Sequence, residues 1–291
     1  MKIQTECVYC LIKRIIFEAE QSTSDPKVRT KVIKNATKKL AELYDPNECS
    51  ITIATQVHKV AYDALGDNDP YKDLKERANK VAETLVPRVE ELVKNSDDPL
   101  KTSMICSIIG NMLDFGIEGA SNDPEGLIDI FEEYLDLGLG YDDTDKLKEL
   151  LSKSKNVLLF TDNCGEFTFD KILCRELKKA YPDINLSLVV KGEPVLSDAT
   201  REDVEKIAFE EVVDRVLDTG CFAVGVDFAQ LPDDLKTALD TADLIICKGM
   251  ANYEAFSETD YKPIAYLMRT KCRPIAKSAE VPFDVNVVKV F

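Results

Sequence analysis

Two acids and an amide stand close together directly after an apolar run. The run spans residues 156–160, Asn-Val-Leu-Leu-Phe, and the next six residues read Thr-Asp-Asn-Cys-Gly-Glu. Asp162, Asn163 and Glu166 thus offer carboxylate and amide oxygens, the ligands that hard divalent cations prefer. The other interpretation is that Asp162 or Asn163 only caps the helix that follows. The segment alone leaves both interpretations open.

A second acid follows the next apolar run. Residues 191–198 read Lys-Gly-Glu-Pro-Val-Leu-Ser-Asp, so Asp198 stands one strand–helix unit after Asp162. In parallel sheets, ligands bind in the crevice beyond the carboxyl ends of the strands. Asp162, Asn163 and Asp198 could therefore converge on one cation, with positions left for water and substrate. Capping of the following helix is the less favoured alternative for Asp198.

A lysine and a glycine follow a further run. Residues 248–254 read Lys-Gly-Met-Ala-Asn-Tyr-Glu. Lys248 could contact a phosphate or oxyanion, because Gly249 lets backbone amides come close to it. Asn252 and Glu254 would complete a polar wall. A solvent-exposed lysine beside a turn is the simpler interpretation of this segment alone.

A fourth polar pair lies in the first half of the chain. Asn111 and Asp114 are three residues apart in an otherwise apolar segment, so they share one helix face. Because buried polar groups need partners, a position facing a cleft is favoured over the core. This places the predicted site between the two halves of the chain.

Two halves with different periodicity are expected to position these residues. Residues 1–145 carry apolar residues at helical spacing and are predicted to form a helical domain. Residues 146–291 alternate β-rich runs with amphipathic stretches, which predicts a Rossmann-like, three-layer α/β/α domain with a mainly parallel sheet. The fold class is therefore α/β, with the active site in the cleft between the domains.

The pattern also predicts individual elements. The β-rich runs are residues 157–160, 186–190, 211–217, 244–247, 273–276 and 285–290. Helices between them are predicted at residues 166–180, 201–209, 232–238 and 258–268. Asp-Pro pairs, among them 25–26 and 98–99, predict turns and helix starts in the first half.

Composition narrows the class of function. The net charge of −16 over 291 residues, with no basic cluster, argues against a nucleic-acid surface. No apolar run is long enough to span a membrane and no signal-peptide core is visible, so a cytoplasmic protein is expected. A single histidine excludes a histidine-based zinc site. The composition does not predict the oligomeric state.

The cysteines and the histidine allow a functional and a structural interpretation. Cys7 and Cys10 lie on one face of a predicted helix and could form half of a four-thiolate metal site, with Cys49 and Cys106 as candidates for the other half. Packing of buried thiols is the simpler interpretation. His58 lies far from the motifs in sequence, where a structural role is expected.

Taken together, the four motifs resemble those of the metal-dependent damage-control phosphatases, catalogued as domain of unknown function 89. The resemblance covers nearly the whole chain and rests on Gly-Asn-x-x-Asp at 110–114, Asp-Asn-x-Gly-Glu at 162–166, Lys-Gly-x-Pro-x-x-x-Asp at 191–198 and Lys-Gly-x-x-Asn-Tyr-Glu at 248–254. The start with Cys-x-x-Cys is similar to the microbial and archaeal branch. Residues 269–272, Arg-Thr-Lys-Cys, depart from the Arg-Thr-x-Lys of a larger eukaryotic branch, whose substrate preference is not carried over.

The resemblance implies that Asp162, Asn163 and Asp198 hold a divalent metal such as Mn²⁺, Co²⁺, Ni²⁺ or Mg²⁺. It also implies that Lys248 contacts the phosphate of a small phosphorylated metabolite, such as a sugar phosphate or a damaged phosphometabolite. Glu254 or Asp198 would orient a metal-activated water. Attack by this water is favoured over a covalent phosphate on Asp162.

Asn111, Asp114, Glu166, Gly249 and Asn252 are the remaining predicted substrate contacts. A binding protein without turnover and an S-adenosylmethionine-dependent methyltransferase are the alternatives. The methyltransferase is disfavoured because no Gly-x-Gly loop follows the first predicted strand.

Overall fold

The computed structural model describes residues 1–113 and 126–291. The helices in these residues are α1 (Thr5–Ser22), α2 (Pro26–Leu43), α3 (Ser50–Leu65), α4 (Lys72–Asn95), α5 (Pro99–Gly110), α6 (Gly126–Asp136), α7 (Thr144–Leu151), α8 (Glu166–Ala180), α9 (Arg201–Lys206), α10 (Asp233–Asp240), α11 (Gly249–Phe256) and α12 (Arg273–Ser278), with 3-10 turns η1 (Asn111–Leu113) and η2 (Phe209–Val212). The strands are β1 (Tyr141–Asp142), β2 (Asn156–Phe160), β3 (Asn185–Val190), β4 (Arg215–Asp218), β5 (Leu244–Lys248), β6 (Ile264–Arg269) and β7 (Asn286–Val290).

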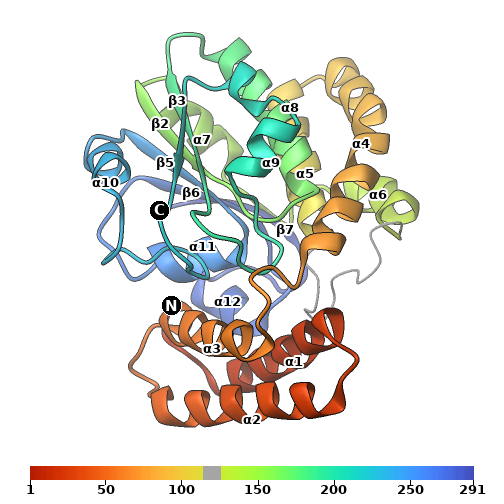
Figure 1. Ribbon diagram of the computed structural model, residues 1–291. Helices are drawn as coiled ribbons and strands as arrows, with labels where there is room; N and C mark the ends of the chain where they lie inside the picture. Colours follow the sequence, from red (N-terminus) through yellow and green to blue (C-terminus); the bar gives the residue numbers. More distant parts are fainter. Residues whose placement is uncertain (114–125) are drawn as a thin grey trace.

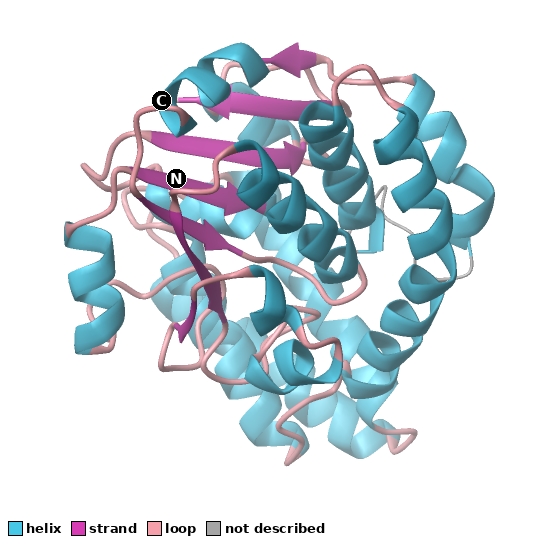
Figure 2. Cartoon of the chain, turned by 90° about the horizontal axis from the view of Figure 1, so that it is seen from above, coloured by secondary structure: helices cyan, strands magenta, loops and turns pink. Residues whose placement is uncertain are grey.

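All of these strands join one sheet, in the order β1-β7-β6-β5-β2-β3-β4 (Figure 2). Strand β2 pairs in parallel with both β3 and β5, whereas β7 runs antiparallel to β6. The predicted α/β class with a mainly parallel sheet is confirmed. From β2 the chain builds outward to β3 and β4 and then returns to β5 on the other side of β2. A crevice for ligands is expected at this switch point, between the carboxyl ends of β2 and β5.

Helices cover both faces of the sheet. Alternate strand residues point to opposite faces. Leu159 and Leu188 pack in a core with α5, α7 and α8. Leu158 and Val189 belong to the core on the other face, which includes α10, α11 and the N-terminal helices. The sheet is thus the middle of three layers.

Helices from the first half of the chain lie in two different parts of the molecule. Helices α1, α2 and α3 pack together at one end of the molecule, beside α11 and α12 (Figure 1). Helix α5, by contrast, contacts α8, β6 and β7 and belongs to a layer over the sheet. The division into domains 1–145 and 146–291 stays a prediction.

Two of the Asp-Pro pairs start helices, as predicted. Helix α2 begins at Pro26, and the side chain of Asp25 accepts a hydrogen bond from the amide of Lys27. Helix α5 begins at Pro99, and Asp98 accepts in the same way from Lys101. Proline suits the first helical turn because the missing N–H has no partner there, and the aspartate satisfies one of the amides that remain.

Two predicted elements near the end of the chain are wrong. The sequence pattern predicts a helix at residues 258–268, but β6 occupies Ile264–Arg269 and is buried between β5 and β7. A short apolar run buried on both faces shows no strand alternation, so periodicity cannot identify it. The pattern predicts a strand at residues 273–276, but these residues begin α12, with Pro274 in its first turn. The predicted strand 211–217 is β4, shortened to Arg215–Asp218 and preceded by η2.

No helix in the described ranges 1–113 and 126–291 is both long enough and apolar enough to cross a membrane.

Candidate active site

The segments that follow β2 and β3 run side by side at the carboxyl edge of the sheet. Asn163 and Asp198 form an antiparallel bridge, and the amide of Ala199 donates to the carbonyl of Asp162 over 2.9 Å. Ser197 donates from Oγ to Oδ1 of Asn163 over 2.5 Å. These bonds bring together the three predicted metal ligands.

The carboxylate of Asp162 lies in a tight turn among amides. Its Oδ2 accepts from Nδ2 of Asn111 over 2.7 Å and from Nδ2 of Asn163 over 2.9 Å. Gly249 approaches from the start of α11 with φ +71°, and a Cβ at this position would lie 1.8 Å from Asp162 Oδ2. Only glycine leaves room for the carboxylate, and only glycine adopts this backbone conformation without strain.

Asp198 is buried and lies 3.3 Å from Nζ of Lys191. Lys191 also donates to the carbonyl of Gly225, so its ammonium is shared between the two groups. The lysine at the exit of β3 therefore contacts the acid that ends the same motif.

A cavity of about 140 Å³ opens beside these residues. Asp162, Asn163 and Asp198 line it from the strand ends, and Glu254 lines it from α11. Helices α1 and α3 contribute Arg14, Ser50 and His58 to the lining. We call this space, defined by these seven residues, the acidic cavity. Among its described lining residues, Arg14 is the one lysine or arginine.

Lys248 does not line the acidic cavity. Its side chain is fully buried and its Nζ contacts Glu166, Asp170 Oδ1 at 2.8 Å and the carbonyl oxygen of Ser107 at 3.2 Å. Burial alone would lower the pKa of Lys248, but the carboxylates of Asp170 and Glu166 raise it well above its ordinary value. The lysine is therefore a charged member of an interior ion cluster, and this placement does not support the predicted phosphate contact.

Other residues that were predicted to contact the substrate instead form hydrogen bonds within the protein near the cavity. Asn252 donates from Nδ2 to the carbonyls of Thr161, at 2.9 Å, and Lys248, at 2.8 Å, so it joins the exits of β2 and β5. Glu166 accepts from Asn111 and contacts Lys248. Asn111, Glu166, Gly249 and Asn252 are absent from the described lining of the acidic cavity. Asp114 lies outside the described residues.

Glu254, the predicted catalytic residue in α11, lines the acidic cavity. Ser50 of α3 donates to its Oε1 over 2.6 Å. Burial raises the pKa of Glu254, although the bond from Ser50 works in the opposite direction. A carboxyl with a raised pKa at a cavity wall is suited to exchanging protons with a ligand.

Sequence reasoning missed the contribution of α1 and α3. His58 Nδ1 lies 2.7 Å from Glu18 Oε1, and both side chains are fully buried. A signal was present, because Arg14 and Glu18 stand four residues apart on the apolar stripe of α1 beside Leu11 and Ile15. Two charges on a core-facing stripe need partners, and these charges face the cavity and the histidine.

Three cysteines also line the acidic cavity. They are Cys7, Cys10 and Cys272, whereas Cys49 and Cys106 lie elsewhere. Across residues 1–113 and 126–291, no group of three or more His, Cys, Asp or Glu is placed to hold a metal ion. The four-thiolate alternative is therefore not formed there, and an oxygen site would depend on the amide of Asn163 in addition to two carboxylates.

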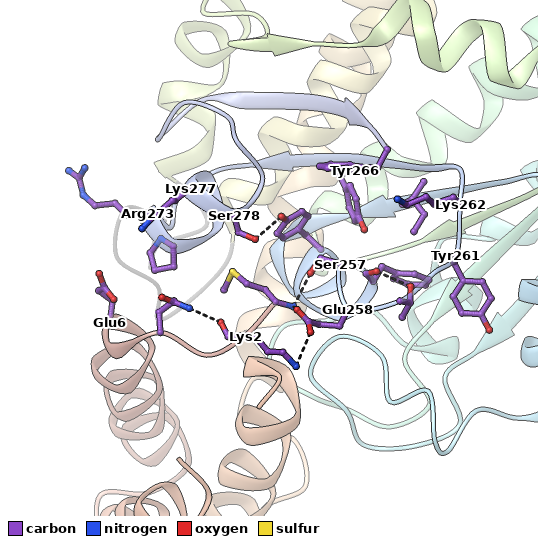
Figure 3. Close-up of a pocket in the computed structure, with 18 residues that line it drawn as sticks. Lys2, Glu6, Ser257, Glu258, Tyr261, Lys262, Tyr266, Arg273, Lys277 and Ser278 are labelled. Atoms are coloured by element: carbon purple, nitrogen blue, oxygen red, sulfur yellow. Dashed lines mark hydrogen bonds and ion pairs between the residues drawn. The ribbon is translucent and has the colours of Figure 1, made fainter. Parts of the chain in front are cut away.

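A larger cavity of about 710 Å³ adjoins the acidic one and shares Glu6 and Pro274 with it. In Figure 3, Lys2 and Glu258 point toward each other, and their ion pair spans 3.0 Å. The rest of the wall includes Tyr253, Tyr261 and Tyr266. None of the predicted metal ligands lines this space in the described part of the chain.

Comparison with known proteins identifies the family. Residues 3–286 match the damage-control phosphatase ARMT1-like domain. A damage-control phosphatase of Archaeoglobus fulgidus is 40% identical over 290 residues, which cover 100% of this chain and 99% of the relative. The chain belongs to the damage-control phosphatase family.

Further members agree in sequence and fold. A damage-control phosphatase of Pyrococcus horikoshii is 30% identical, with 97% of this chain and 96% of the relative covered. A crystal structure of a DUF89 family protein from the same organism superposes with a TM-score of 0.89 at 29% identity, covering 100% and 99% of the two chains. The family resemblance stated from the four motifs is confirmed over the full length.

Proposed function

We propose that this damage-control phosphatase family member is a metal-dependent phosphatase of small phosphomonoesters, such as sugar phosphates or damaged phosphometabolites. Asp162, Asn163 and Asp198 would hold one divalent cation, Mn²⁺, Co²⁺, Ni²⁺ or Mg²⁺. The observation that carries the proposal is that these residues, from two adjacent strand exits, line one cavity at the switch point of the sheet. The names of the relatives support phosphate ester hydrolysis as the reaction class.

The donor set fits a hard divalent cation. Two carboxylates and an amide offer oxygen atoms only, which suits Mg²⁺ and Mn²⁺, while the missing Cβ of Gly249 leaves space around Asp162. Nδ2 of Asn163 faces Asp162 and its Oδ1 accepts from Ser197, so the amide would have to turn over to present its oxygen beside Asp162. The cation, when bound, offsets phosphate charge and lowers the pKa of a water.

Protein side chains would bind the phosphate, orient the attacking water and hold the strand exits in place. Arg14 would contact phosphate oxygens, because it lines the cavity and a guanidinium donates in a fork that matches them. Glu254, held by Ser50, would orient the attacking water and accept its proton. The Lys248 cluster would keep the exits of β2 and β5 in place beneath the cavity.

Chelation and metal return test this proposal. The purified protein is treated with a chelator and then supplied with single divalent metals, while phosphate release is followed from p-nitrophenyl phosphate and a panel of sugar phosphates. We expect turnover only with metal, and loss of turnover in Asp162→Ala. Asp183→Ala, at an exposed position away from the site, is the matched control.

Two outcomes would contradict the proposal. Metal-independent turnover, or retained turnover in Asp162→Ala, would remove the assigned cation site. Silence of the wild-type protein with every metal would favour a binding protein without turnover.

A further inference from the structure

We propose that His58, oriented by Glu18, donates a proton to the leaving oxygen of the phosphomonoester. This inference rests on the proposed phosphatase function and assigns a further catalytic residue to the same site. His58 is the single histidine of the chain. It comes from α3, and Glu18 comes from α1, so neither belongs to the strand-end motifs.

The pair brings one ring nitrogen of His58 next to a carboxylate at the cavity. Nδ1 of His58 lies 2.7 Å from Glu18 Oε1, and the hydroxyl of Tyr71 donates to the same oxygen over 3.5 Å. The contact of Nδ1 is at ion-pair distance, although its geometry is not that of a hydrogen bond, and the ring lines the acidic cavity. Rotation of the ring would align Nδ1 with the carboxylate, and Nε2 would then be the nitrogen left for the reacting group.

Both partners of the pair are buried. Glu18 is 0% exposed and His58 is 1% exposed. A carboxylate in such a place is costly unless polar partners compensate it, and the groups beside Glu18 are the ring of His58 and the hydroxyl of Tyr71.

The placement of His58 separates it from the nucleophile. The residues proposed to hold the cation follow β2 and β3, whereas His58 and Arg14 line the same cavity from α3 and α1. In phosphoryl transfer the attacking and leaving oxygens are roughly in line on opposite sides of phosphorus. With the attacking water at the strand ends, the proposal assigns the leaving oxygen to the part of the cavity lined by α1 and α3, which includes His58.

The charged groups around the ring are consistent with this role. From α1 they are Glu18 and Arg14, from the strand ends Asp162 and Asp198, and from α11 Glu254. The ion pair of His58 is with Glu18 and not with the acids at the strand ends. Lys191 pairs with Asp198, and Glu6 adds a further carboxylate to the lining.

The step balances without another reactant. A water oxygen forms a bond to phosphorus while the bond from phosphorus to the ester oxygen breaks. Nε2 of His58 gives its proton to that oxygen, which leaves as an alcohol, and the ring keeps the proton on Nδ1 facing Glu18. Glu254 takes a proton from the attacking water, and exchange with solvent restores both groups.

The leaving group provides the test. An alkoxide leaving from a sugar phosphate needs a proton, whereas p-nitrophenolate is stable without one. We expect His58→Asn to lower kcat for a hexose phosphate by ~10²- to 10⁴-fold, the usual contribution of general acid catalysis, and to change p-nitrophenyl phosphate turnover little. Retained turnover of p-nitrophenyl phosphate also shows that the variant is folded and binds metal.

Other outcomes overturn the inference. Equal losses with both substrates in His58→Asn and His58→Gln, with an unchanged melting temperature, would assign the ring to binding or water activation. Unchanged hexose phosphate turnover would make it structural. If the wild type releases no phosphate from either substrate, the phosphatase function fails and the inference falls with it, which the wild-type assay alone reveals.

Glu18 is a positioning residue and is tested separately. Glu18→Gln keeps a hydrogen-bonding group of the same size but removes the charge. We expect a loss that is again larger for the hexose phosphate than for p-nitrophenyl phosphate. Nitrogen-15 spectra of the single histidine give a readout independent of activity: the neutral ring should carry its proton on Nδ1 in the wild type. A proton on Nε2 instead would contradict the orientation by Glu18.

Discussion

Two groups of acids at the same edge of the sheet differ in their surroundings. Around Lys248, the carboxylates of Glu166 and Asp170 are buried together with the ammonium. In the acidic cavity, Asp162, Asp198 and Glu254 line an open space together with Arg14, and Asp198 also lies 3.3 Å from Lys191. The first group is closed around its lysine, whereas the second borders a cavity in which we propose a cation. Neighbouring strand exits thus contribute to a buried ion cluster and to the lining of a cavity.

The largest expected effect is on activity at Asp162. Asp162→Asn should lower kcat on the order of 10³-fold, because several kcal/mol of metal-derived transition-state stabilisation would be lost. Its stability without metal should change by less than about 1 kcal/mol, since the amide retains much of the packing. Steady-state assays and urea unfolding measure the two quantities.

The effect of Mn²⁺ on the melting temperature tests whether Asp162 belongs to the cation site. A cation that binds only the folded protein should raise the melting temperature of the wild type, but not of Asp162→Asn. Equal shifts in both proteins would place metal binding elsewhere.

At Lys248 we expect a large loss of stability, in contrast to the loss of activity expected at Asp162. Lys248→Met removes the cation from two buried carboxylates and should lower the free energy of unfolding by about 3–5 kcal/mol. Urea unfolding measures the change, and Lys38→Met, at an exposed position of α2, is the control. A near-neutral Lys248→Met that abolishes only activity would contradict the division between the two clusters.

Gly249 lies at the boundary between the clusters. Gly249→Ala should cost about 1–2 kcal/mol for the left-handed backbone, and the methyl group should displace the Asp162 carboxylate and reduce turnover. Gly66→Ala is a close control, because Gly66 has φ +70° and no atom lies within 4 Å of the place that a methyl group would take there. The backbone cost should appear in both variants, and the loss of activity only in Gly249→Ala.

The smallest effect concerns the thiols of the acidic cavity. Burial raises the pKa of Cys7 to about 11 and that of Cys272 to about 12. Because the thiolate is the reactive form, alkylation of both should be slow at neutral pH and should accelerate as the pH rises toward these values. Mass spectrometry of iodoacetamide-treated protein measures the rates. Fast labelling at pH 7 would show that the cavity wall opens to solvent.

The strand-end part of the site was predictable because it depends on short-range patterns. An apolar run followed by polar residues marks a strand exit, and parallel pairing then places Asp162, Asn163 and Asp198 at one edge. The same rule placed Lys248 at a strand exit but did not predict where its side chain points. Whether a lysine at an exit points to solvent, ligand or interior depends on the acids of α8, and no local pattern specifies that contact.

The wall from α1 and α3 was not predicted, because it depends on how helices dock. Arg14 and Glu18 were visible as charges on an apolar stripe, but their partner His58 lies on another helix. The missed strand β6 has a related cause. Its residues are buried on both faces, and only its neighbours β5 and β7 distinguish it from a buried helix.

The two-sided construction of the acidic cavity has a consequence for how the protein refolds. The strand-end acids come from consecutive βαβ units, while Arg14 and His58 come from helices far away in the chain. Contacts between distant segments close the longest loops and form slowly. Recovery of turnover should therefore lag behind recovery of helical and sheet circular dichroism, and the active site is expected to be among the last features that a refolding chain completes.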